Sequence, residues 1–106
     1  MAFSIKQNNT SPSLLATLKD ANDVPVNITG ADVRFHMKSL EGVVKIDSDM
    51  TVVNSAEGLV RYDWVVGDTD TFGTYYVEFE VAYIDGSVET FPNTGSLVVS
   101  VVKELN

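Results

Sequence analysis

Apolar and polar side chains alternate along most of this chain, and long helical periodicity is missing from it. The clearest case is the run TYYVEFEVAYI at residues 74–84. Its odd-numbered positions from 75 to 83 are all apolar or aromatic, whereas glutamates stand at positions 78 and 80. Successive side chains of a β-strand point to opposite faces, so this pattern constrains the chain to form sheets with one buried face.

The same alternation predicts further short strands. In residues 31–38, Val33, Phe35 and Met37 share one face, and the opposite face carries three basic or titratable side chains. A polar turn is expected at residues 47–49. We expect about eight or nine short strands in a single domain, residues 1–106, which is long enough for one hydrophobic core. The other predicted strands are residues 2–7, 14–19, 43–47, 51–54, 59–64, 87–91 and 96–103.

The stretch DTDTFGTYYVEFEV at residues 68–81 has the form of a corner between two packed sheets. Gly73 and Tyr75 predict a tyrosine corner, in which the phenol hydroxyl bonds to backbone a few residues upstream. Val77 stands where an immunoglobulin domain carries its second cysteine, and the chain has no cysteine. We expect Val77 to pack against Trp64 or Phe35 instead. The predicted fold is an all-β, immunoglobulin-like antiparallel β-sandwich without a disulfide.

Two turn signals follow this strand. Asp85 and Gly86 predict a type I′ hairpin, in which both central residues have positive φ. Pro92 has no backbone donor, so the chain should bulge or leave the sheet there.

The net charge of −8 disfavours binding to nucleic acid and to anionic membranes, because such an acidic surface repels phosphate groups. The first residues lack a basic segment followed by a long apolar run, so we expect folding in the cytoplasm without a cleaved signal.

No catalytic motif stands out, so we expect a non-enzymatic protein without cofactor or metal. His36 is the only histidine and cannot build a zinc site alone. Two interpretations of it stay open, a solvated strand face, which is favoured, and a pH-sensitive basic contact patch. The aspartate pairs at 20/23, 47/49 and 68/70 lack the order of a calcium loop and are interpreted as turn formers.

Apolar side chains on both faces of a predicted strand indicate either a covered sheet or a contact with a partner. Phe72 and Tyr76 are the best candidates for an aromatic contact with a ligand. The other candidates for partner contact are Leu15, Leu59, Val98 and Val102.

Several segments together resemble the N-terminal domain of the phage baseplate upper protein family. They are residues 3–39, the motif GLVRYDW at 58–64, residues 73–95 and the final apolar strand. The most specific pieces are VNITGA at 26–31 with VRF at 33–35, and FPNTG at 91–95.

The resemblance implies a non-enzymatic structural protein of a tailed bacteriophage virion, in a baseplate, a tail tip or a related assembly. It would attach to other virion proteins, as a homo-oligomer in the particle, after synthesis in the host cytoplasm. Capsid decoration and a host-surface or carbohydrate-binding module remain the alternatives.

Overall fold

A computed structural model describes residues 2–92 and 97–105 of the chain. Within them the chain forms nine β-strands, and it contains no apolar helix of membrane-spanning length. In chain order the strands are β1 (Ala2–Lys6), β2 (Leu14–Thr17), β3 (Asp32–Ser39), β4 (Val44–Asp49), β5 (Thr51–Asn54), β6 (Leu59–Tyr62), β7 (Gly73–Ala82), β8 (Val88–Phe91) and β9 (Leu97–Val102).

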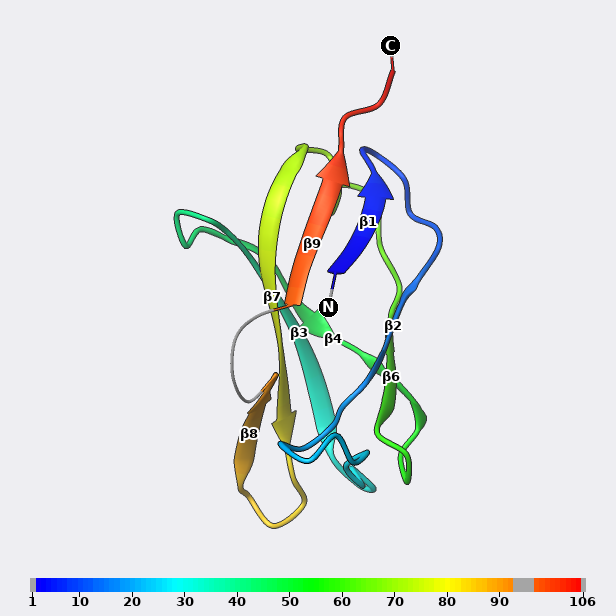
Figure 1. Ribbon diagram of the computed structural model, residues 1–106, viewed down its shortest axis with the longest axis vertical. Helices are drawn as coiled ribbons and strands as arrows, with labels where there is room; N and C mark the ends of the chain where they lie inside the picture. Colours follow the sequence, from blue (N-terminus) through cyan, green and yellow to red (C-terminus); the bar gives the residue numbers. More distant parts are fainter. Residues whose placement is uncertain (1, 93–96, 106) are drawn as a thin grey trace.

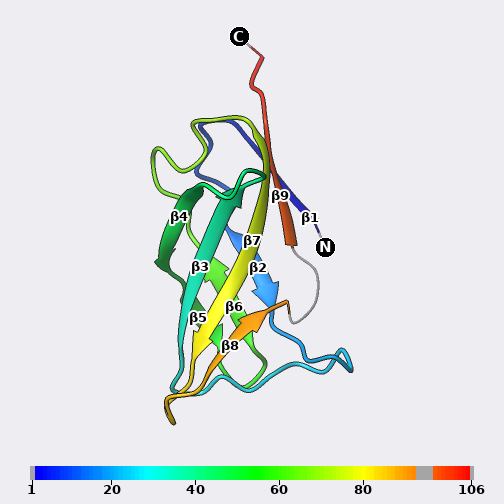
Figure 2. The same cartoon turned by 90° about the vertical axis from the view of Figure 1, so that its left-hand side faces the viewer.

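The strands form two sheets that face each other (Figures 1 and 2). The six-stranded sheet has the order β1-β9-β7-β3-β4, and β8 also pairs with β7. The three-stranded sheet has the order β2-β6-β5. The predicted all-β, immunoglobulin-like sandwich is therefore confirmed. Among the described strand pairs β1 and β9 run parallel, and the others are antiparallel.

The centre of the larger sheet is the pair β3 and β7, which stay in register from Asp32 opposite Ala82 to Ser39 opposite Tyr75. On each strand, alternate side chains are buried, as the sequence pattern predicts. The inward side chains therefore fix which residues of both strands face outward.

Aromatic side chains join the two sheets in the core. The Phe35 ring of β3 stacks on the Tyr62 ring of β6, with centroids 4.2 Å apart and an interplanar angle of 10°. Trp64 meets both rings edge-on, at 5.8 Å from Phe35 and 5.2 Å from Tyr62. Val77 is fully buried in the same cluster. An apolar contact between the sheets thus occupies the region that a disulfide bridges in immunoglobulin domains.

The corner before β7 has the geometry that its sequence predicts. Tyr75 Oη donates a hydrogen bond to the carbonyl oxygen of Thr71, four residues upstream, at 2.7 Å. Gly73 begins β7 with φ +150°, a conformation that L-residues rarely adopt. This hydrogen bond anchors the entry into β7 to the preceding loop.

The hairpin after β7 differs from the prediction. Gly86 has positive φ, but Asp85 does not, so the turn is not type I′. Gly86 N donates to Tyr83 O, and Tyr83 N donates to Ser87 O, which leaves a three-residue loop ending in a left-handed glycine. The Asp85 carboxylate accepts bonds from the Ser87 N–H and hydroxyl, and these local bonds favour the longer loop.

Two further predictions concern the turn at residues 47–49 and the break after β8. Residues 47–49 are not a turn but belong to β4, because their backbone pairs with β3. Asp47 and Asp49 also bind the outward side chain of Arg34. Strand β8 ends at Phe91, directly before Pro92. The remainder of the predicted FPNTG break, residues 93–95, lies outside the described residues.

Replacing Tyr75 with phenylalanine tests the corner. We expect the free energy of unfolding to fall by about 1 kcal/mol, the net contribution of one hydrogen bond. The melting temperature should drop by about 4–8 °C in a domain of this size. Tyr76→Phe is the matched control, because the Tyr76 hydroxyl has no partner among the described residues and its side chain is exposed. Equal melting temperatures for the two variants would show that the corner bond contributes nothing.

Candidate functional site

The outward side chains of β3 and β7 form a track on the solvent face of the six-stranded sheet. The register places Lys38 opposite Tyr76, and Arg34 opposite Glu80. We call this set the outer track; it consists of Asp32, Arg34, His36, Lys38, Tyr76, Glu78, Glu80 and Ala82.

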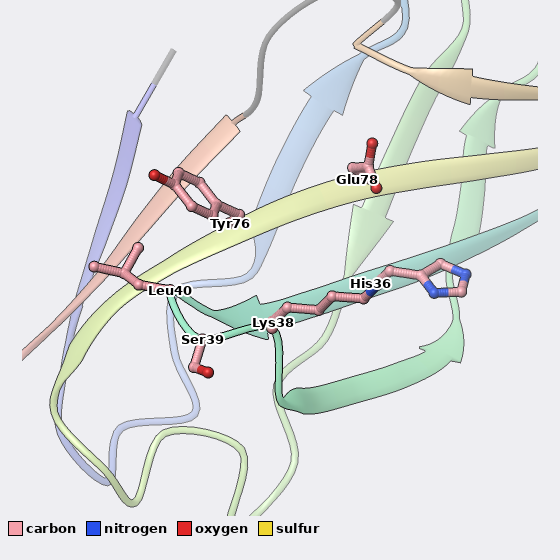
Figure 3. A pocket seen from close by; sticks show the side chains of 7 residues that line it. His36, Lys38, Ser39, Leu40, Tyr76 and Glu78 are labelled. Atoms are coloured by element: carbon pink, nitrogen blue, oxygen red, sulfur yellow. The ribbon is translucent and has the colours of Figure 1, made fainter.

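One end of the outer track is a shallow hollow with a volume of about 240 Å³. Its apolar part is formed by Tyr76, which is 46% exposed, and by Leu40, which is 58% exposed. Lys38 runs along β3 toward His36 and away from the Tyr76 ring (Figure 3). The hollow is lined by His36, Lys38, Ser39, Leu40, Gly42, Tyr76 and Glu78.

A second hollow, of about 520 Å³, continues the track toward the other end of the same strands. Glu80 lies in it, two residues beyond Glu78 of the first hollow and on the same face of β7. Arg34 follows His36 in the same way on β3. The two hollows therefore lie end to end along one strand pair, with an aromatic end and an acidic end.

Arg34 turns away from Glu80 and toward β4. Its Nη1 donates to Asp49 Oδ1 at 2.8 Å, and its Nε and Nη2 donate to Asp47 Oδ1 at 3.0 and 2.9 Å. The hydrogen bond to Asp47, followed by the charges of both aspartates, raises the pKa of Arg34. Glu80 is left without a hydrogen bond or ion pair to any described residue.

The same arginine also protects an edge of the sheet. Met50 N donates to Val33 O, so alternate residues of β4 direct their backbone groups away from β3, and Asp47 is one of them. Arg34 Nη2 donates to that Asp47 carbonyl at 3.0 Å. Lys45 of β4 makes a 2.5 Å ion pair with Asp70. Charged side chains that occupy an edge strand hinder its pairing with another chain.

His36 faces Asp47 of β4 on one side and Glu78 of β7 on the other. Its Nε2 lies 3.7 Å from Asp47 Oδ1, which is longer than a hydrogen bond, and has no hydrogen-bond partner among the described residues. The histidine therefore belongs to the outer track, where its Nε2 makes no hydrogen bond to a described residue.

The six predicted partner-contact residues do not form one surface. Tyr76 lies in the first hollow, and Val98 is its neighbour on β9. Phe72 is 52% exposed, with the Lys103 ammonium 5.4 Å from its ring centroid, and Val102 is 43% exposed. Leu15, 59% exposed, and the half-buried Leu59 lie on the other sheet.

Sequence reasoning missed Leu40, Glu78 and Glu80 as site residues. The glutamates already had a signal, since the alternation of β7 places them on the outer face with Tyr76. Leu40 had none, because it follows the last residue of β3 and lies outside the strand pattern.

The aspartates singled out in the sequence mostly organise loops. Asp20 Oδ1 accepts the N–H groups of Asn22 and Val24, and Asp68 Oδ2 accepts the Val65 N–H and the Tyr62 hydroxyl. No group of three potential metal ligands occurs in residues 2–92 and 97–105.

Comparison with known proteins finds a similar fold and no family. No protein-family model and no curated protein matches the chain. A solved structure of CopC from Methylosinus trichosporium OB3b is similar, with a TM-score of 0.56 and 12% sequence identity over 98% of this chain and 86% of that chain. At this identity the similarity shows the fold alone.

This result corrects the functional prediction. The sequence led us to expect a structural protein of a phage virion, or a capsid-decorating or host-surface module on one. The similar solved structure is that of CopC, and no family model and no curated protein links the chain to a phage protein. We therefore abandon the virion assignment. The resemblance to the baseplate upper protein family stays a prediction, because no family model matches the chain.

Replacing Arg34 with glutamine tests the protection of the β4 edge. Without the guanidinium, the Asp47 carbonyl is open to a second chain, and we expect self-association that increases with protein concentration in sedimentation experiments. Arg61→Gln is the control, because Arg61 has the same charge and nearly the same exposure, 39% against 40%, but pairs with Asp63 on the other sheet. Equal sedimentation of both variants would contradict the role of Arg34.

Replacing Lys45 with glutamine tests the second edge contact. The hydrogen bond from Lys45 is the main cause that lowers the pKa of Asp70, so the pKa should rise toward 3.8. A lowered carboxylate pKa stabilises the fold above the unfolded-state pKa, and this stabilisation is lost as the pH falls through the folded-state pKa. The variant should lose the part of that acid dependence that comes from the Lys45 contact. Carboxyl NMR titration measures the shift, and Lys19→Gln, which removes the 3.6 Å pair with Asp23, should leave Asp70 unchanged.

Proposed function

We propose that the chain is a non-catalytic binding domain that attaches to a partner protein through the outer track of its six-stranded sheet. The supporting observation is the pair of exposed apolar side chains, Tyr76 and Leu40, in a hollow beside the charged side chains of the outer track. Tyrosine in a preformed hollow is typical of protein interfaces, because it offers a large contact area at a small entropic cost.

The arrangement of titratable groups supports a binding role over a catalytic one. His36 is the only histidine, and no described hydroxyl group is hydrogen-bonded to it. A nucleophile and its general base need such a contact. Both hollows are also only partly enclosed, whereas small-molecule sites enclose most of their ligand.

Substitutions in the first hollow test this function. The purified domain is used to capture its partner, which is identified by mass spectrometry and then titrated in pure form. We expect Tyr76→Ala to raise the dissociation constant by about tenfold, which corresponds to the loss of a contact of about 1.4 kcal/mol. Leu40→Ser should raise the dissociation constant by a smaller factor, because leucine is a less frequent hot spot.

Leu15→Ser is the matched control for Leu40→Ser. Leu15 is 59% exposed, against 58% for Leu40, but lies on the three-stranded sheet. Loss of binding in Leu15→Ser, with unchanged binding in Leu40→Ser and Tyr76→Ala, would place the interface on the opposite side of the sandwich and refute the proposal.

A further inference from the structure

The charges of the outer track are unbalanced. Its strongest cation, Arg34, is already neutralised by Asp47 and Asp49. The carboxylates of Asp32, Glu78 and Glu80 make no hydrogen bond or ion pair with any residue in the described part of the chain. Lys38 is the one cation of the described track that has no such partner.

The track also has a direction and a length. Tyr76, Glu78, Glu80 and Ala82 follow one another at every second position of β7, from the aromatic hollow to the acidic one. Six residue steps at about 3.3 Å span about 20 Å. An extended segment that lies along the sheet has the same two-residue period, so its side chains on one face match these positions in spacing.

We propose that the outer track binds an extended, basic segment of a partner protein. This inference rests on the proposed function and names the chemistry of the partner. An apolar side chain of the segment packs on Tyr76 and Leu40, and arginine or lysine side chains two and four residues away meet Glu78 and Glu80. Arginine is the better match, because its planar fork pairs with carboxylates in a bidentate way.

The net charge of the whole chain also favours a basic partner. With a net charge of −8, the domain attracts a basic segment over long range and repels a second copy of itself. A partner covering this face with acidic side chains would place like charges opposite Glu78 and Glu80. Charge complementarity therefore favours a basic protein segment over self-association.

Fluorescence anisotropy with synthetic peptides tests the inference on the full chain. The probe is a labelled eight-residue peptide with leucine at position 2, arginine at positions 4 and 6, and threonine or serine elsewhere. It is used together with the peptide of reversed sequence, because the strand direction is open. A peptide with glutamate in place of arginine is the specificity control. We expect an arginine peptide to bind saturably, and added salt to weaken this binding. The glutamate peptides should not bind.

Single substitutions locate the site. Glu78→Gln and Glu80→Gln should each weaken peptide binding by about two- to fivefold, the range for an exposed ion pair. Glu57→Gln, in the turn before β6, changes the net charge equally and should have no effect beyond it. Lys38→Gln should have the opposite sign and tighten binding, because it removes a cation from the track.

The outcomes separate this inference from the proposed function. Equal binding of arginine and glutamate peptides, equal effects of Glu57→Gln and Glu80→Gln, or no saturable binding overturns the basic specificity. If the captured partner still depends on Tyr76 and Leu40 in those cases, the binding domain stands and only its partner chemistry is wrong. A concentration-dependent dimer of the unaltered chain that Tyr76→Ala dissociates would show that a second copy covers this face, and would overturn the inference.

Discussion

The stack of Phe35 on Tyr62 is the contact on which the rest of the structure depends. It joins β3 of one sheet to β6 of the other, with centroids 4.2 Å apart, and Trp64 closes it edge-on. Aromatic pairs of this kind contribute about 0.5–1.5 kcal/mol beyond their buried area. Because Phe35 points inward, its neighbours on β3 must point outward, and the position of the binding face follows from the packing of the core.

The features that depend on local alternation could be predicted from the sequence. The buried and exposed sides of β3 and β7, the hydrogen bond at Tyr75 and the burial of Val77 all follow from side-chain period and from a short corner motif. The hairpin at Gly86 could not be predicted in detail, because an Asp-Gly pair suits both a two-residue and a three-residue loop. The hydrogen bonds from Ser87 to Asp85 favour the three-residue loop, and they depend on atomic geometry.

The candidate site was less predictable than the fold, because it depends on pairing across strands. The order of residues does not show that β3 lies between β7 and β4. The sequence alone therefore cannot predict whether Arg34 pairs with Glu80 on one side or with the β4 aspartates on the other. The functional prediction failed for a related reason. Short turn and strand motifs recur in many sandwiches, and a resemblance built on them follows the fold more closely than the function.

The pairing of Arg34 with β4 links edge protection to binding. On the β4 side, Arg34 finds two carboxylates and a backbone carbonyl, whereas β7 offers it Glu80 alone. The guanidinium has five donors in a planar fork, so the richer set of acceptors wins. Closing the β4 edge therefore leaves the Glu80 carboxylate of β7 unpaired on the solvent face. The acidic end of the outer track is a direct consequence of how the sheet protects its edge.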